Sequence, residues 1–190
     1  MSVVREFETV DRILSSEAPT RGVDAFALSL IKAERQVRKL FTHLIYQAPV
    51  FGVADVPALR SALVASRRVY FGGFLDGIDA LYARPVEDLV GPDYLRLKAR
   101  LGEAIDHRNK IFHGQLTSRS LTTSELISLS GDIRVWCTTL GNNSSAEVGY
   151  DGFGRNSFQK SAIPELWKRY RVQLGSLPDY EAFIRTNMER

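Results

Sequence analysis

The chain has 190 residues, 44% of them hydrophobic and 25% charged, with a formal net charge of +3 at pH 7. These values are ordinary for one globular domain with a hydrophobic core, and the small positive charge permits nucleic-acid binding without requiring it. The single cysteine, Cys137, excludes an internal disulfide, and no stretch reaches the roughly 18 apolar residues of a membrane span.

Missing motifs exclude further classes of function. The histidines and the cysteine are scattered, so we expect no metal site. The chain has no phosphate-binding loop and no dinucleotide fingerprint, so we expect no cofactor. Residues 1–25 carry carboxylates and no apolar run, which argues against a signal peptide. With Cys137 expected to be a buried, inert thiol, this favours a reducing, cytoplasmic location.

Two amphipathic helices are expected first. Residues 2–15 form one, followed by a turn-rich stretch over 15–22. The next helix is the clearest in the sequence and ends before Pro49, with its basic residues, Arg38 among them, on other faces. Its apolar side chains recur at steps of four and three: Phe26, Leu30, Ala33, Val37, Leu40 and Leu44.

A third helix is expected to start after an N-cap at Asp55 and to run to about residue 83. Three glycines within it, Gly72, Gly73 and Gly77, favour a kink or a close helix crossing over a ligand role. Proline-containing turns then lead to a helix over residues 94–112.

A last long helix is expected to begin at Thr122, the N-cap of a capping box with Glu125, and to stop at Gly141. Shorter helices are expected around residues 166–174 and from Asp179. The sequence therefore predicts an all-α fold, an antiparallel bundle of four to five main helices over 1–143. Residues 144–190 form a loop-rich C-terminal extension of the same domain.

This extension has two interpretations. Arg155 and Lys160 can contact a phosphate backbone, and Tyr150 can stack on a base. Alternatively, the loop packs its aromatic side chains onto the bundle.

The helix over 94–112 contains one residue that breaks its own apolar pattern. Large apolar residues follow steps of three and four through Tyr94, Leu97 and Leu101, and the step of four after Ala104 falls on Arg108. Burying an unpaired charge is costly. Arg108 therefore needs a carboxylate, an RNA phosphate or polar groups of a second subunit.

His113 follows five residues later, before Gly114, a residue suited to ending a helix. Five helical residues rotate the side chains about 140° apart, so Arg108 and His113 diverge on one unbroken helix. They meet only if the helix ends or kinks between them, or if two copies of the chain pack together.

The stretch from Arg108 through Asn109 to His113 and Gly114 resembles the Arg-(polar)-x-x-x-His signature of the HEPN superfamily. This resemblance implies an all-helical domain that dimerises through its motif helices, forms a composite cleft and cleaves RNA without a metal. It also implies a role in a toxin–antitoxin, phage-defence or stress-response system, with an antitoxin or regulatory protein as partner. Gln115 stands where one branch of toxins has a modified Tyr, which puts that style of regulation in doubt.

The bare spacing occurs a second time, at Arg38 and His43. This pair lacks the Asn and the Gly, and we interpret it as the solvated flank of a structural helix.

Cleavage without a metal requires a base for the 2′-OH proton, a cation for the phosphate oxygens and an acid for the 5′-oxygen. His113 suits the base or the acid, because an imidazole titrates near neutral pH. Arg108 offers donors that match a phosphate, and Asn109 can position the phosphate or orient the imidazole. The expected products carry 2′,3′-cyclic phosphate and 5′-hydroxyl ends.

Three neighbours are expected to support this site. Glu103 and Asp106 can hold Arg108 by ion pairing, and Lys110 can add positive potential. His107 is expected at the surface. The alternative is that the polar cluster is an inert inter-helix network in a non-catalytic helical dimer, used as a binding or scaffold module.

Overall fold

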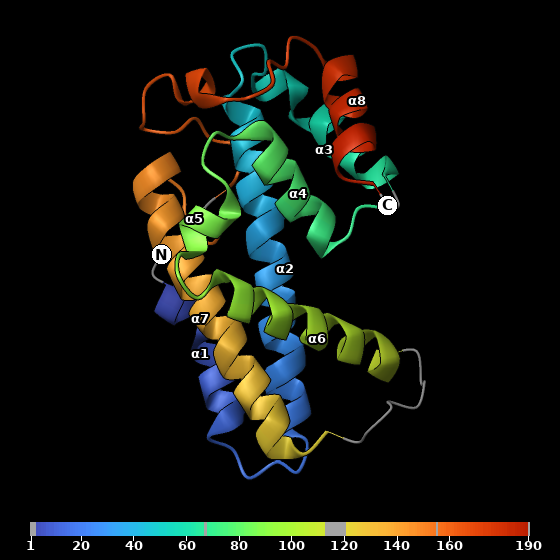
Figure 1. Ribbon diagram of the computed structural model, residues 1–190, viewed down its shortest axis with the longest axis vertical. Helices are drawn as coiled ribbons and strands as arrows, with labels where there is room; N and C mark the ends of the chain where they lie inside the picture. The colour runs from blue at the N-terminus through green and yellow to red at the C-terminus, as the bar shows by residue number, and fades with distance from the viewer. Residues whose placement is uncertain (1–2, 67, 113–120, 155, 190) are drawn as a thin grey trace.

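A computed structural model describes residues 3–66, 68–112, 121–154 and 156–189, and within these ranges the fold is built of helices (Figure 1). The long helices are α1 (Val3–Leu14), α2 (Arg21–Gln47), α6 (Tyr94–Phe112) and α7 (Thr123–Val148). The shorter ones are α3 (Val56–Ala65), α4 (Phe71–Leu81), α5 (Val86–Val90) and α8 (Leu177–Asn187), with 3-10 turns η1 (Val53–Asp55) and η2 (Leu166–Arg169). The predicted all-α fold is confirmed.

Helices α2 and α7 form the centre of the molecule and run in the same direction (Figure 1). Later residues of α2 contact later residues of α7: the Ser29 and Ser130 hydroxyls lie 2.7 Å apart, and the Gln36 side chain donates to the Cys137 carbonyl at 2.9 Å. The antiparallel arrangement that we expected therefore does not describe this pair. Both predicted apolar stripes, from Phe26 to Leu44 and from Leu126 to Leu140, are buried in the common core.

Helix α6 crosses in front of this pair, and its second half extends beyond α2 (Figure 1). Its bounds, Tyr94–Phe112, agree with the prediction. The apolar positions at Leu97, Leu101 and Ala104 are buried, and no helix break occurs between Arg108 and Phe112. The motif is therefore continuous helix from Arg108 to Phe112.

The predicted third helix is in fact two, α3 and α4. The chain between them is extended at Val69, which forms an antiparallel bridge with Glu189 near the C-terminus. The glycines of α4 allow a close approach, as expected: a Cβ on Gly73 would lie 2.2 Å from the Met188 carbonyl oxygen. Packing of the chain after α8 against α4 is thus the reason for a glycine at position 73.

Helix α7 continues past Gly141, where we expected it to stop, and ends at Val148, before the C-cap Gly149 with its left-handed φ of 73°. Gly141 is buried, and the side chain of Asn143 donates to the Leu89 carbonyl at 2.7 Å, so this turn packs on the short helix α5. The expected boundary between residues 143 and 144 falls inside α7. The helix expected around 166–174 is only the 3-10 turn Leu166–Arg169.

The tail after α7 packs along the C-terminal half of α2, which supports the second interpretation of this segment. Polar side chains of α2 form hydrogen bonds with the backbone of the tail: Gln36 donates to the Asp151 carbonyl at 3.0 Å, and Gln47 accepts from the Ser161 amide at 2.7 Å. His43 is fully buried among these contacts, 3.2 Å from the Ser157 carbonyl. The expectation that His43 is solvated is therefore wrong, because the tail covers it.

In the part of the chain that the structure describes, no helix is both long enough and apolar enough to cross a membrane.

The close approach at Gly73 gives a stability test. Gly73→Ala should lower the free energy of unfolding by about 1–3 kcal/mol, because the added Cβ must displace backbone at Met188. Gly131→Ala in α7 is the control: its Cβ meets nothing within 4 Å, so it should stabilise by up to about 1 kcal/mol. Urea unfolding of both variants measures the difference. Equal stabilisation by the two would contradict the packing argument.

Candidate functional site

Helix α6 is fixed to α7 by a shared carboxylate. Asp132 of α7 accepts from Arg96 at 2.8 Å and from Arg100 at 2.9 Å. Burial raises the pKa of Asp132, but the hydrogen bonds from Arg100 and Arg96 outweigh it, so the pKa lies below its ordinary value. Together with the buried residues Leu97 and Leu101, these contacts set the position from which the rest of α6 extends.

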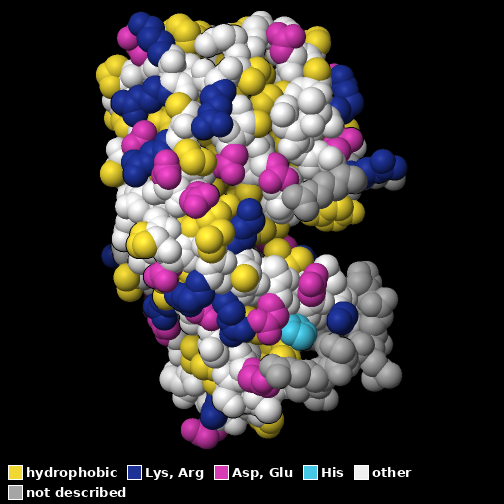
Figure 2. Space-filling model, viewed as in Figure 1, with side chains coloured by type: hydrophobic (Ala, Val, Ile, Leu, Met, Phe, Trp, Pro, Cys, Tyr) yellow, Lys and Arg dark blue, Asp and Glu magenta, His cyan; other side chains and the backbone are white. Residues whose placement is uncertain are grey.

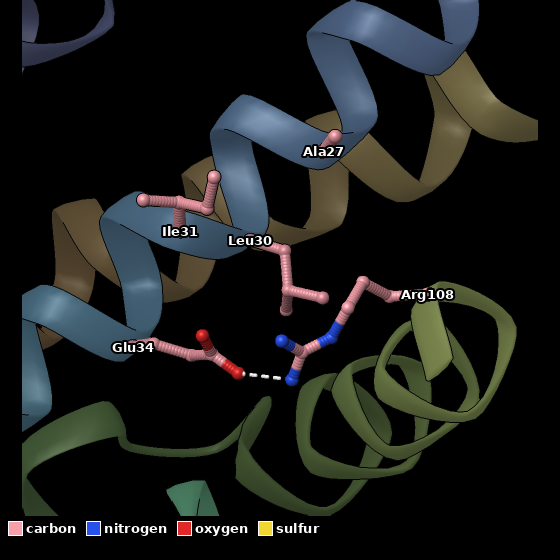
Figure 3. A pocket seen from close by; sticks show the side chains of 5 residues that line it. All are labelled: Ala27, Leu30, Ile31, Glu34 and Arg108. Atoms are coloured by element: carbon pink, nitrogen blue, oxygen red, sulfur yellow. Dashed lines mark hydrogen bonds and ion pairs between the residues drawn. The ribbon is translucent and has the colours of Figure 1, made fainter. Parts of the chain in front are cut away.

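Arg108 is paired with a carboxylate of another helix. Its Nη2 donates to Oε1 of Glu34 on α2 at 2.6 Å, and 30% of each side chain is exposed (Figure 3). The Arg108 Nε is buried and has no hydrogen-bond partner among the residues described. The carboxylate that the sequence pattern required therefore comes from α2, and the expected partners Glu103 and Asp106 do not supply it.

Two hollows meet at this ion pair. A small one of about 210 Å³ lies between α2 and α6 and is lined by Ala27, Leu30 and Ile31 together with Glu34 and Arg108 (Figure 3). The larger, of about 880 Å³, lies between α4 and α6 over α2, and we call it the α4–α6 cleft. Figure 2 shows the surface hollowed above α6 at this place. Arg108 thus stands where both hollows can be reached.

The structure brings several of the predicted residues to this cleft. Asn109 and Asp106 are exposed and line it, next to Arg108. Lys110 is half-buried on the last turns of α6. His113, the second half of the motif, lies outside the described residues.

Glu103 and His107 form a separate cluster on α6. Glu103 accepts from Arg100, and its other oxygen lies 3.6 Å from Nε2 of His107. The His107 side chain is only 12% exposed, and its Nδ1 is buried without a hydrogen-bond partner in the described ranges. The expectation that His107 is a surface residue is therefore wrong.

Two of the three tail residues proposed to bind RNA, Tyr150 and Lys160, pack against α2. Tyr150 is 2% exposed and its ring lies 4.6 Å from that of His43, so it cannot stack on a base. The Lys160 ammonium donates to the carbonyls of Tyr46 and Ala48 at the end of α2, at 2.5 and 3.1 Å. Burial lowers the pKa of Lys160. Arg155 lies outside the residues that the structure describes.

Sequence reasoning missed the cleft residues that come from other helices. Glu34 is part of the polar face of α2, and nothing in the spacing of α2 indicates that α6 crosses at this point. Arg38 is exposed, as expected for a solvated flank, but it lies one turn after Glu34 and also lines the cleft. The exposed Tyr70, before α4, also lines it. The presence of a charged residue in the apolar pattern at Arg108 indicated that it needs a partner. It did not indicate that the partner is Glu34.

Comparison of the chain with protein-family models, with curated proteins and with solved structures gives no match. Among the described residues there is also no group of three or more His, Cys, Asp and Glu placed to hold a metal ion.

The attachment of α6 has a testable pH dependence. The folded-state pKa of Asp132 lies below its unfolded value of 3.8. The contribution of Asp132 to the free energy of unfolding is therefore fully present above that pH. It is lost as the pH falls through the folded-state pKa. Asp132→Asn should therefore lower the free energy of unfolding most at neutral pH, and the difference from the native chain should shrink below about pH 3.8. Urea unfolding across this range measures it; a constant difference would contradict the ionic origin.

The Arg108–Glu34 pair can be measured with a double-mutant cycle of Arg108→Ala and Glu34→Ala. We expect a coupling of about 1 kcal/mol, because the pair is mostly shielded from solvent. The Arg12–Glu8 pair, whose side chains are 78% and 57% exposed, is the control and should couple by only about 0.3–0.5 kcal/mol. Equal couplings would mean that the pairing does not position Arg108.

Proposed function

We propose that this protein is a metal-independent endoribonuclease of the HEPN type. The observation that carries the proposal is the guanidinium of Arg108, fixed by Glu34 at the wall of a cleft beside the exposed amide of Asn109. The sequence adds His113 in the spacing and context of the family signature. No other cluster in the described chain combines a positioned cation, an exposed amide and a cleft.

The proposed chemistry uses these groups as follows. Arg108 stabilises the negative charge that gathers on the phosphate oxygens during attack of the 2′-OH, which a preoriented guanidinium does without reorganisation. Asn109 positions the phosphate or orients the imidazole of His113. His113 takes the 2′-OH proton as base, and the His113 of a second copy returns a proton to the 5′-oxygen as acid. The products carry 2′,3′-cyclic phosphate and 5′-hydroxyl ends.

The composite site requires a homodimer through the motif helices. Ile31 on α2, 53% exposed beside Arg108, and the neighbouring Ala27 leave apolar surface at this place that supports such a contact. We propose a toxin–antitoxin, phage-defence or stress-response setting in the cytoplasm, in which an antitoxin or regulatory protein restrains the activity. A ribonuclease of this kind needs such restraint because its substrate is present throughout the cell.

A cleavage assay on labelled single-stranded RNA and tRNA in EDTA tests the activity. Arg108→Ala and His113→Ala should lower the cleavage rate by about 100-fold or more, and Asn109→Ala should lower it less. Arg35→Ala is the control: it lies on the same helix as Glu34, is exposed and does not line the cleft. Products with 5′-phosphate ends, or a requirement for a metal, would contradict the proposal.

A second candidate is a non-catalytic helical dimer that serves as a binding or scaffold module. The Arg108–Glu34 ion pair favours it, because it satisfies the charge of Arg108 within the fold. This candidate predicts no cleavage by the native chain and a loss of about 2 kcal/mol or more of stability in both Arg108→Ala and Glu34→Ala. The nuclease instead predicts an inactive Arg108→Ala that remains close to native stability.

A further inference from the structure

The α4–α6 cleft extends from the candidate catalytic residues toward the other end of α6. One wall is α6, with Lys98 and Gly102, and the opposite wall is the start of α4, with Tyr70. Arg38 of α2 lies between these walls. The volume of the cleft, about 880 Å³, is within the roughly 300–1,000 Å³ of small-ligand sites.

Three cations line this cleft, and of these Arg38 is the one without an anionic or hydroxyl partner in the described chain, beside the carboxylates Glu34, Asp76 and Asp106. Arg108 is paired with Glu34, and the Lys98 ammonium donates to the Tyr94 hydroxyl at 3.0 Å and faces the carboxylates Asp76 and Asp79. Arg38 has no ion pair within the described chain. Its guanidinium lies 5.5 Å from the centre of the Phe74 ring, which orients the plane while leaving the donors accessible.

The wall across from α6 offers a flat aromatic surface. Tyr70 is 66% exposed, and it precedes the first residue of α4. An exposed ring and an unpaired guanidinium that line one cleft are the combination with which proteins bind single-stranded nucleic acid: a base stacks on the ring and a phosphate contacts the cation.

Gly102 leaves the α6 wall of the cleft without a side chain at this position. It lies in the middle of α6, where glycine costs about 1 kcal/mol relative to alanine. No packing requires it, because a Cβ at this position would meet nothing within 4 Å. Because Gly102 lines the cleft, a larger side chain at this position would enter it.

We propose that the α4–α6 cleft is a subsite for an unpaired nucleotide that flanks the cleaved bond. Its phosphate binds Arg38 and its base stacks on Tyr70. This inference rests on the proposed ribonuclease function, and it assigns the substrate a single-stranded segment at the site of cleavage. In a duplex the bases are stacked inside, so none can reach Tyr70. The proposed contacts are made to the phosphate and to the face of the base. The subsite therefore selects unpaired RNA without strong sequence preference.

Binding of a labelled single-stranded RNA with 2′-O-methyl riboses tests the subsite, because this probe cannot be cleaved through the 2′-OH. Tyr70→Ala should weaken binding about tenfold, through the loss of one stacked base. Arg38→Ala should weaken it as well and lower the slope of log affinity against log salt concentration by about 0.7, since one phosphate contact is lost. Arg35→Ala is the matched control and should leave affinity and slope unchanged. The matching duplex should bind poorly.

A steric block tests the same subsite without removing a contact. Gly102→Leu places a side chain into the cleft and should weaken binding about tenfold while raising helix stability. Gly131→Leu is the matched control, because Gly131 is also helical and exposed, has open space at its Cβ, and lies on α7 outside the cleft. Thermal unfolding of both variants verifies that each is folded.

The outcomes separate this inference from the proposed function. Cleavage by the native chain, with Arg38→Ala, Tyr70→Ala and Gly102→Leu all equal to their controls, overturns the subsite and leaves the ribonuclease intact. Binding that depends on Arg38 and Tyr70, without cleavage, supports the subsite and overturns the ribonuclease. Absence of RNA binding by the native chain overturns the subsite, as does equal affinity for single strand and duplex.

Discussion

The parallel packing of α2 against α7 is the constraint on which the other contacts of this fold depend. One side of α2 is buried along its length against α7, which leaves its remaining faces for other tasks. Its C-terminal half holds the tail through Gln36, His43 and Gln47, and its middle presents Glu34 and Arg38 to the cleft. The same helix therefore supports the core and supplies part of the candidate site.

The placement of Arg108 connects the energetics of the fold with the proposed chemistry. A guanidinium at a core position needs a counter-charge, and Glu34 provides it from a helix that is itself fixed by the core. The pairing orients the side chain before any substrate arrives, which is what electrostatic stabilisation of a transition state requires. A network of this kind also serves a purely structural role, so activity and stability must be measured on the same variants.

The two Arg-x4-His pairs of the sequence have different surroundings in the fold. Arg38 and Arg108 both begin an Arg-x4-His pair, and sequence context favoured only the second. In the fold both arginines line one cleft, whereas the two partner histidines differ: His43 is buried beneath the tail, and His113 lies outside the described residues. The tail, which offered basic and aromatic residues in sequence, uses Tyr150 and Lys160 to cover α2.

The helices whose patterns are local could be predicted from the amino-acid sequence. The apolar stripes of α2 and α7, the capping box at Thr122 and the bounds of α6 follow from periodicity and capping within a few residues. Only the tertiary structure decided the partner of Arg108, the direction of α7 relative to α2, the break between α3 and α4, and the burial of His43. Each of these depends on contacts between residues far apart in sequence, and local spacing carries no information about them.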